Sequence, residues 1–398
     1  MIYVGIDVAK DKHDCHIVRA NGKVLVDNFT FANSREGFKA FSEILSTHRR
    51  REEEIKVGLE YTGHYSHNLL AYLKEAGYTV VALNPLTVNM YRKSKSLRST
   101  KTDKSDARYI AEVTAETAVD KRRYVKNDIG TLKSLTRYRF RMQKTVQSLK
   151  NRYRRVLQIV FPEFENIFDL RCKTTVDLLI KYPSPRDVLR MDKEELAKSL
   201  DKISRGHYGK KTDALIDAAE KSIGTANAGD VFELKHLAKQ ISFLQKEVED
   251  VDAKLLAILQ KLNTPILSIP GVGVSTGATI LAEIGNIKNF ETSAKLLAFV
   301  GCEPNIYQSG KFLLTHAQMV KKGSKYLRSA VFHTTKSAYL ADPVMRAYVD
   351  KKRAEGKHFF VALTHGMKKM VRLLFAVLTS GEEYHPPIRK PIAAAETN

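Results

Sequence analysis

Residues 2–9, IYVGIDVA, and residues 55–60, IKVGLE, decide the fold of this chain, because each is a short apolar run with an acidic residue near its end. Between them, residues 15–20 (CHIVRA) and 24–31 (VLVDNFTF) are separated only by the turn sequence NGK. β-Branched runs split by such a turn predict a β-hairpin or meander. The first run therefore opens a predicted sheet, and residues 55–60 add a further strand.

Helical patterns alternate with these strands. Phe38, Phe41 and Leu45 recur at helical spacing over residues 34–48, and another helical pattern precedes the apolar run YTVVAL. A polar, basic segment then predicts a mobile loop, with a helix from about residue 102. Strands alternating with helices predict an α/β fold in which a mixed sheet carries helices on its faces.

Acidic residues end two of the predicted strands and begin a later helix. Asp7 and Glu60 end neighbouring strands, so both should reach one edge of the sheet, and Asp103 and Asp106 share one helix face. Four converging carboxylates repel one another unless divalent cations neutralise them, and oxygen ligands suit Mg²⁺ or Mn²⁺. Two such ions can clamp the attacking and leaving oxygens of a phosphodiester.

Each acidic residue also has an ordinary structural explanation. Asp7 can cap a turn, and Glu60 can be a surface residue. Asp103 can cap a helix whose dipole favours Asp106. The joint order is more specific: a strand-end Asp, a hairpin, a strand-end Glu and a late Asp pair resemble the ribonuclease-H-like arrangement of resolvases and transposases.

The net charge of +22 points to a polyanionic partner. Residues 121–155 hold thirteen Lys or Arg and one acidic residue, Asp128, so this window alone carries +12. Nucleic acid is the expected partner. No apolar run reaches the length of a membrane-spanning helix, and the N-terminal sequence lacks a signal pattern, so we expect a cytoplasmic, nucleoid-associated protein.

Arginines interleaved with aromatic residues in this region suit phosphate contact and base stacking. The arginines are Arg122, Arg123, Arg137, Arg139, Arg141, Arg152, Arg154 and Arg155, and the aromatic residues are Tyr124, Tyr138, Phe140 and Tyr153. The alternative is a solvated helix face. The lack of compensating acidic residues makes that alternative weaker.

Two heptad-like seams, over residues 142–160 and 237–262, predict long helices that form a helical hairpin or a dimer stalk. Residues 162–232 show a polar helical pattern without a chemical motif. We divide the chain into a catalytic domain (1–120), a basic, coiled-coil region for oligomerisation and nucleic-acid contact (121–262), a mainly helical domain (263–381) and a disordered tail (382–398).

The third of these parts begins with IPGVGVSTGATILAEIG, residues 269–285, which resembles a helix-hairpin-helix element. In such an element Gly271 and Gly273 let backbone N–H groups approach a DNA phosphate. A glycine turn between packed helices explains the same string equally well.

A polar turn further on carries Ser309 and Gly310, and a basic string follows it. The basic residues are Lys321, Lys322, Lys325 and Arg328. A serine hydroxyl near phosphate-binding cations can act as a nucleophile. A Ser-Gly pair is, however, ordinarily a turn or a cap, and spacing alone does not raise Ser309 above that explanation.

Six strings occur in order along most of the chain: VGIDVAKDKHD, GLEYTGHY, KTDKSDARYIAE, IPGVGVSTGATILAEIGNIKNF, FVGCEPNIYQSGKF and KKGSKYLR. In these strings the chain resembles transposases of the IS110 family of bacterial and archaeal insertion sequences. The resemblance is weakest over residues 160–232. It implies a DEDD domain similar to the Holliday-junction resolvase RuvC, a coiled coil, and a C-terminal, mainly helical transposase domain with a catalytic serine.

The resemblance further implies roles for individual residues. Asp7, Glu60, Asp103 and Asp106 would hold Mg²⁺, and Ser309 would attack a DNA phosphate to form a phosphoserine linkage. Strand exchange would pass through a Holliday-junction-like intermediate. A noncoding bridge RNA would pair with donor and target DNA while the protein reads backbone and shape. Homo-oligomers, dimers pairing into a tetramer, would join the DEDD half of one protomer to the serine half of another.

Two other functions stay open at this point. The chain can be a metal-only nuclease or junction resolvase in which Ser309 is structural. It can also be a non-catalytic RNA or DNA scaffold whose acidic residues serve folding.

Overall fold

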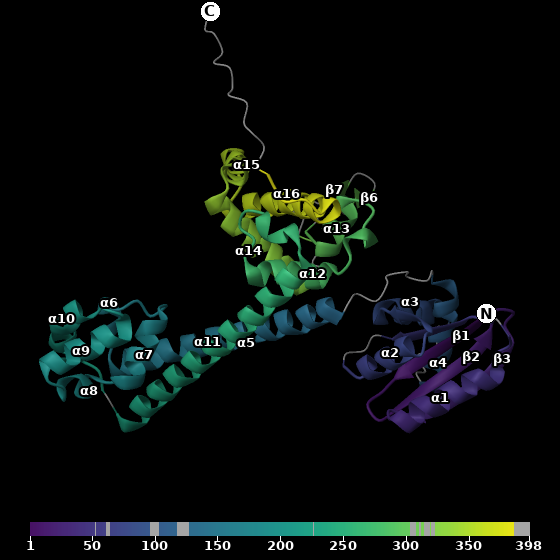
Figure 1. Cartoon of the computed structure of the whole chain (residues 1–398), viewed down its shortest axis with the longest axis horizontal. Coiled ribbons are helices and arrows are strands. Elements are labelled where there is room, and N and C mark those ends of the chain that lie inside the picture. Colours follow the sequence, from purple (N-terminus) through teal and green to yellow (C-terminus); the bar gives the residue numbers. More distant parts are fainter. Residues whose placement is uncertain are drawn as a thin grey trace, which may run out of the picture. The chain divides into compact units, whose positions relative to one another are not determined.

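The computed structural model describes residues 1–51, 53–60, 64–95, 103–117, 127–225, 227–302, 308–309, 312–313, 319 and 323–385. The chain divides into two compact units, unit 1 (residues 1–123) and unit 2 (residues 124–398), which are drawn in Figure 1. Within the described ranges no helix combines the length and apolar character needed to cross a bilayer.

Unit 1 is built on a five-stranded mixed sheet in the order β3-β2-β1-β4-β5. Strands β1 (Ile2–Val8), β2 (Lys12–Arg19) and β3 (Val24–Ala32) form the predicted antiparallel meander. Strand β4 (Ile55–Glu60) pairs in parallel with β1, and β5 (Thr79–Leu83) pairs in parallel with β4. This is the strand order of a ribonuclease-H-like sheet, so the predicted mixed sheet is confirmed.

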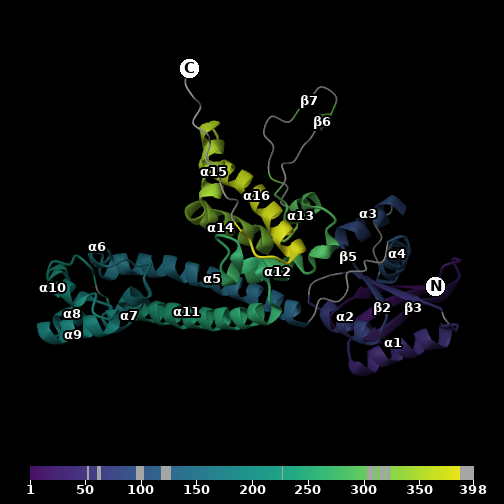
Figure 2. The same ribbon diagram turned by 45° about the horizontal axis from the view of Figure 1, so that its top comes forward.

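Helices cover both faces of this sheet. Helix α1 (Arg35–His48) starts at the N-cap Ser34, whose hydroxyl accepts a hydrogen bond from the Gly37 N–H. It shares one apolar core with α2 (Ser66–Glu75). The opposite face is covered by α3 (Pro85–Lys95) and α4 (Asp103–Glu116). Figure 2 shows α1 and α4 on opposite sides of the sheet.

Helix α3 was not foreseen by the sequence. The basic segment from Arg92 was predicted to be a loop, yet its first residues, through Lys95, are helical. The helix is held by burial of Val88 against Ile110 and Val113 of α4, a contact that sequence periodicity does not reveal. Residues 96–102 of the same predicted loop lie outside the described residues.

Helix α4 lies very close to the sheet because the strands beneath it carry glycine. A Cβ atom on Gly5 would lie 2.8 Å from the Cα of Ala111, and one on Gly58 would lie 2.9 Å from the Cβ of Thr114. Real Cβ atoms essentially never come this near to other heavy atoms. Any larger residue at either glycine would therefore push α4 off β1 and β4.

The other end of α4 is tied to the start of β4. The Lys56 ammonium, at the second position of β4, donates a hydrogen bond to the carbonyl of Thr117, just beyond the C-terminus of α4. Burial lowers the pKa of Lys56. Helix α4 consequently runs antiparallel to β4, and its N-terminus lies towards the end of β4 that carries Glu60.

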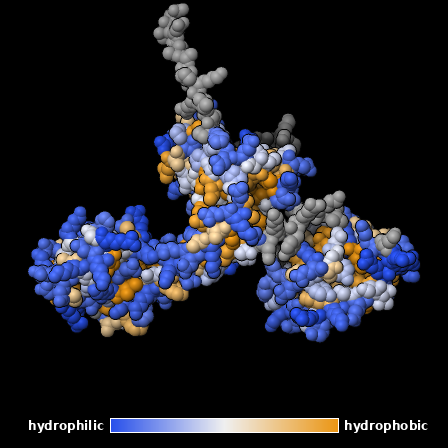
Figure 3. Space-filling view, viewed as in Figure 1, coloured by the Kyte–Doolittle hydropathy of each residue, from blue (hydrophilic) through white to orange (hydrophobic). Residues whose placement is uncertain are grey.

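Unit 2 contains two long helices, α5 (Asn127–Val160) and α11 (Ala228–Leu262), packed along each other. The two predicted seams face each other: Met142 shares a core with Val251, and Val156 shares another with Ile241. Of the two predicted arrangements, these seams form the helical hairpin. The surface of the paired helices is largely hydrophilic in the view of Figure 3.

Residues 162–232 fold into a small helical cap on this hairpin. It contains α6 (Phe164–Ile167), α7 (Lys173–Lys181), α8 (Pro185–Leu189), α9 (Lys193–Ser204), the 3-10 turn η1 (Gly209–Lys211) and α10 (Thr212–Glu220). Phe161, Phe164 and Phe168 are buried in its core. The polar helical pattern is therefore amphipathic, with each short helix contributing a few core residues.

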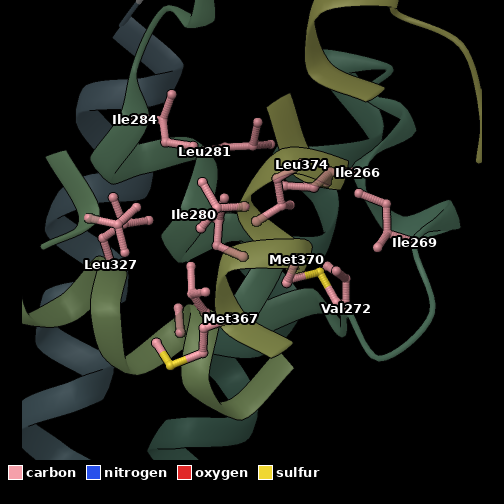
Figure 4. Packing of buried hydrophobic residues seen from close by; sticks show 14 of the residues in the cluster. Ile266, Ile269, Val272, Ile280, Leu281, Ile284, Leu327, Met367, Met370 and Leu374 are labelled. Atoms are coloured by element: carbon pink, nitrogen blue, oxygen red, sulfur yellow. The ribbon is translucent and has the colours of Figure 1, made fainter. Parts of the chain in front are cut away.

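The C-terminal part of unit 2 is a helical bundle, as predicted. It comprises the 3-10 turns η2 (Pro265–Ser268) and η3 (Ile287–Asn289), helices α12 (Val274–Ile284), α13 (Ser293–Val300), α14 (Lys325–Ala341), α15 (Pro343–Ala354) and α16 (Phe359–Ser380), and the short strands β6 (Gln308–Ser309) and β7 (Phe312–Leu313). Figure 4 shows Ile280 and Leu281 of α12 packed with Met370 and Leu374 of α16. Residues 386–398, most of the predicted tail, lie outside the described residues.

The two glycines of the predicted helix-hairpin-helix differ in their surroundings. Gly271 has φ +85°, and a Cβ there would lie 2.6 Å from the carbonyl oxygen of Thr334 and 2.9 Å from the Cα of Ala338 on α14. Gly273 has φ −96°, and a Cβ there would have nothing within 4 Å. Packing therefore explains Gly271, whereas Gly273 leaves open space for an approaching group.

We predict that Gly271→Ala lowers the free energy of unfolding of unit 2 by about 2 kcal/mol or more, because it adds left-handed strain and a backbone overlap. Gly273→Ala, two residues away, is the matched control and should change it by less than about 0.5 kcal/mol. Urea unfolding followed by circular dichroism measures both. Equal effects of the two substitutions would contradict this packing.

We predict that Gly5→Ala destabilises unit 1 by about 2 kcal/mol or more, since α4 must move to admit the methyl group. Gly130→Ala is the control, because a Cβ at Gly130 on α5 meets nothing within 4 Å. Alanine is the better helix former, so the control should be neutral or stabilising by about 0.5–1 kcal/mol. A Gly5→Ala protein with the wild-type unfolding curve would show that α4 is not in close contact with β1.

Candidate active site

Two of the predicted site residues, Asp7 and Glu60, lie on the sheet face that α4 covers. Asp7 and Glu60 directly follow the register pair Ile6 and Leu59, so they are neighbours across the parallel strands β1 and β4. Each lies two positions beyond a glycine that approaches α4, and residues two apart on a strand share a face. The register thus brings these two predicted site residues together beneath α4.

The N-terminal turn of α4 supplies Asp103 and Asp106. The Asp106 carboxylate is buried and forms an ion pair with Arg92 of α3, whose Nη1 lies 3.2 Å from Oδ1. Arg92 also donates a hydrogen bond from Nη2 to Oδ1 of Asn89, at 2.9 Å. The side chain of Asp103 lies outside the described residues, although its backbone begins the helix.

A second contact fixes α3 against α4. The Tyr91 hydroxyl donates a hydrogen bond to Oε1 of Glu116, at 3.1 Å. Burial, this hydrogen bond and the nearby carboxylate of Glu112 together raise the pKa of Tyr91 to about 12, so the phenol stays protonated at neutral pH. The contact helps to hold Arg92 in place, since the two residues are adjacent on α3.

A further carboxylate, Asp14, was missed by the sequence reasoning. It is the antiparallel register partner of Asp7, is 5% exposed, and accepts a hydrogen bond from the Thr30 hydroxyl. The Lys12 ammonium lies 3.7 Å from its Oδ2. Like charges directly opposite on neighbouring strands are destabilising, so this edge of the sheet favours cations. Pairing residues outward from the turn at residues 9–11 would have revealed Asp14.

These residues offer only oxygen donors, which fits a hard divalent cation such as Mg²⁺ or Mn²⁺. Among the side chains that the structure describes, no three His, Cys, Asp or Glu lie close enough together to hold a metal ion. The side chain of Asp103 is not among them. The Asp106 carboxylate nevertheless already has a cationic partner, because it forms an ion pair with the Arg92 guanidinium.

Several of the predicted phosphate-binding arginines form ion pairs within unit 2. Arg137 forms a bidentate pair with Glu283, at 2.7 and 3.1 Å, and Arg139 forms one with Asp252, at 2.6 and 2.9 Å. Arg152 reaches Glu233 at 3.2 Å. Burial alone would raise the pKa of Glu283, but the Arg137 contact outweighs it and brings that pKa below its usual value.

Three other predicted nucleic-acid-binding arginines stay at the surface, whereas Arg328 is half-buried. Arg141, Arg154 and Arg155 are exposed and form no salt bridge with a described residue. Arg328 donates a hydrogen bond to the carbonyl of Val300, at 3.3 Å, and the Lys325 ammonium lies 5.3 Å from the centre of the adjacent Tyr326 ring.

The remaining predictions fall where little is described. Ser309 belongs to β6, and its backbone pairs with Phe312 of β7, but its side chain lies outside the described residues. Five other predicted residues lie wholly outside the described residues: Arg122, Arg123, Gly310, Lys321 and Lys322.

Comparison with known proteins identifies two domain types in this chain. Residues 4–162 match the family model of the DEDD transposase domain of IS110 elements, described as a transposase. Residues 263–350 match the model described as "Transposase IS116/IS110/IS902 family". A DEDD nuclease domain implies a divalent metal, and a transposase acts on DNA.

Similar proteins cover nearly the whole chain. The insertion element IS110 uncharacterized 43.6 kDa protein of Streptomyces coelicolor is 25% identical over 96% of this chain and 95% of that protein. The corresponding IS116 protein of Streptomyces clavuligerus is 26% identical over 97% and 96%. A pilin gene-inverting protein of Moraxella bovis is 23% identical over 98% and 99%. The chain belongs to the IS110/IS116/IS902 family of transposases, with a DEDD domain followed by the C-terminal transposase domain of that family.

Proposed function

We propose that this transposase cleaves and exchanges DNA strands with a metal-binding carboxylate site in unit 1 and a serine nucleophile in unit 2, guided by RNA. The observation that supports it most directly is the adjacency of Asp7 and Glu60 beneath α4, whose first turn carries Asp103 and Asp106. In this proposal a sheet edge and a helix end each contribute acidic residues to one site on a strongly basic chain.

In this proposal Asp7, Glu60, Asp103 and Asp106 hold Mg²⁺ or Mn²⁺. The ions would supply charge stabilisation for the attacking and leaving oxygens of a phosphodiester. The chain itself keeps the carboxylates in register through the close packing of α4 on Gly5, and Arg92 neutralises part of their charge. A guanidinium beside a carboxylate cluster is also suited to contact a phosphate oxygen.

The proposed covalent step uses Ser309. Its hydroxyl oxygen attacks a DNA phosphorus, a serine–phosphate ester bond forms, and the bond from phosphorus to the departing sugar oxygen breaks. The serine proton leaves during attack, and the departing oxygen takes up a proton. Attack by the hydroxyl of another strand reverses these events, releases the serine and joins the exchanged strands. Two such exchanges pass through a Holliday-junction-like intermediate.

The proposed partners are donor and target DNA and a noncoding bridge RNA. The exposed arginines of α5, Arg141, Arg154 and Arg155, support contact with phosphates, and Gly273 leaves room for a backbone to approach. Recognition of sequence would then come from base pairing with the RNA. We also propose that dimers pair into a tetramer, so that the domain 1–120 of one protomer works with the domain 263–381 of another.

A second function, site-specific DNA inversion, is favoured by the similarity to pilin gene-inverting proteins over 98% of this chain. Inversion uses the same cleavage and rejoining, but both sites lie on one DNA molecule. A plasmid carrying the two element ends in inverted orientation separates the two outcomes. Inverted product indicates inversion, and joined donor and target molecules indicate transposition.

We predict that Asp7→Asn lowers Mg²⁺-dependent DNA cleavage by roughly 10²–10³-fold, because charge stabilisation at the reacting phosphate is lost. Asp11→Asn, an exposed aspartate just beyond β1, is the matched control and should cleave like wild type. Mg²⁺ should also raise the unfolding temperature of wild type and of the control, but not of Asp7→Asn. Normal recombination by Asp7→Asn would instead favour a scaffold role.

We predict that Ser309→Ala abolishes covalent protein–DNA attachment. The protein is incubated with Mg²⁺, the RNA of its element and labelled donor and target DNA, and adducts that resist SDS are counted. Ser337→Ala, an exposed serine on α14, is the control and should form adducts like wild type. Cleavage by wild type without any adduct would reduce the enzyme to a metal-only nuclease and remove Ser309 from the chemistry.

A further inference from the structure

A groove of about 400 Å³ opens in unit 2 between α5, α12 and α14. One wall is aromatic, because the rings of Phe140 and Tyr326 meet edge to face with their centroids 5.0 Å apart. Hydroxyl and amide groups line much of the rest, among them those of Ser275, Thr276 and Gln143. Its volume lies within the range of pockets that bind small ligands.

The charge lining the groove is positive. Arg139 and Lys144 line it, and no Asp or Glu of the described part of the chain does. Arg139 is already paired with Asp252, but Lys144 forms no salt bridge with a described residue. The Lys144 ammonium lies 5.2 Å from the centre of the Phe140 ring. A cation without a described salt-bridge partner therefore lies beside an aromatic face, while the negative charge of nearby Asp252 is paired with Arg139.

The aromatic wall is held by an ion pair behind it, in which the carboxylate is buried. Arg137 of α5 forms its bidentate pair with Glu283 of α12, and its guanidinium carbon lies 4.9 Å from the centre of the Tyr326 ring. Glu283 is 6% exposed whereas the Arg137 side chain is 37% exposed, so solvent screens this pair in part. Three helices are thereby fixed to one another at the groove, and the ring of Tyr326 is oriented before any ligand arrives.

We propose that this groove binds an unpaired nucleotide of a nucleic-acid strand, with its base against Phe140 and Tyr326 and its phosphate near Lys144. A flat ring beside an anion matches an aromatic wall beside a cation, and hydroxyl groups suit the base edges and the sugar. A duplex keeps its bases stacked inside, and an acidic peptide need not present a flat ring. The inference deepens the proposed function and rests on it only in taking an RNA or DNA strand as the ligand.

The test is fluorescence anisotropy with labelled uridine and deoxythymidine oligonucleotides of about twelve nucleotides and a duplex of equal length. The full-length protein is used in EDTA, so that no cleavage occurs. Phe140→Leu keeps apolar bulk but removes the aromatic face, and it should weaken single-strand binding by about tenfold or more. Phe140→Tyr should bind like wild type. If Phe140→Leu weakens binding of the RNA oligonucleotide alone, the bound strand is RNA. If it weakens binding of the DNA oligonucleotide alone, the bound strand is DNA.

Lys144→Ala should weaken binding and lower the slope of log affinity against log salt by about one, as expected for one phosphate contact. Lys254→Ala, an exposed lysine on α11 outside the groove, removes the same charge and should leave the slope unchanged. Wild-type single-strand binding by folded Phe140→Leu would overturn the proposal, as would equal losses on single strands and duplex. Because these readouts need no metal and no Ser309, they can fail or succeed independently of the adduct assay.

Discussion

The close approach of α4 to β1 and β4 is the constraint on which unit 1 depends. Gly5 allows the backbone of α4 to lie directly against β1, and Gly58 leaves room for the Thr114 side chain of α4 above β4. The Lys56 ammonium holds the opposite end of α4 through the carbonyl of Thr117, so the helix can neither lift nor slide freely. Backbone packing therefore helps to hold Asp7 and Glu60 of the strands and Asp106 of the first helical turn on one side of the sheet.

Carboxylates placed this close together repel one another, and neighbouring side chains offset part of that repulsion. Asp7 and Asp14 are register partners, and Asp106 is buried nearby on α4. Thr30, Lys12 and Arg92 each satisfy one of the described carboxylates through a hydrogen bond or an ion pair. An arginine at Asp106 lowers the repulsion among these groups without removing their oxygen donors. These hydrogen bonds and ion pairs thus offset part of the repulsion within the fold itself.

Local sequence patterns revealed the sheet but not every helix. Alternating runs gave β1 to β5, and the Asp7 and Glu60 positions followed from the strand ends. Helix α3 was missed because its basic composition suggests a loop, and its contacts with α4, through Val88, Tyr91 and Arg92, cannot be read from sequence spacing. The bounds of the short helices after Phe161 were not predicted, because each helix contributes few residues to a shared core. Such contacts depend on partners that no short window of sequence contains.

The arginines of α5 show that function, too, cannot be predicted fully from short stretches of sequence. Charge density over residues 121–155 suggests many phosphate contacts, yet Arg137 and Arg139 are paired with acids 146 and 113 residues away in the sequence. Those acids lie on α12 and α11, so the pairs join three helices and leave less positive charge for nucleic acid. What they provide instead is position, since Arg137 orients the Tyr326 ring. Some basic residues of one helix therefore hold neighbouring helices in place, and the others are left exposed to contact nucleic acid. Which residues do which depends on where acidic residues lie in the fold.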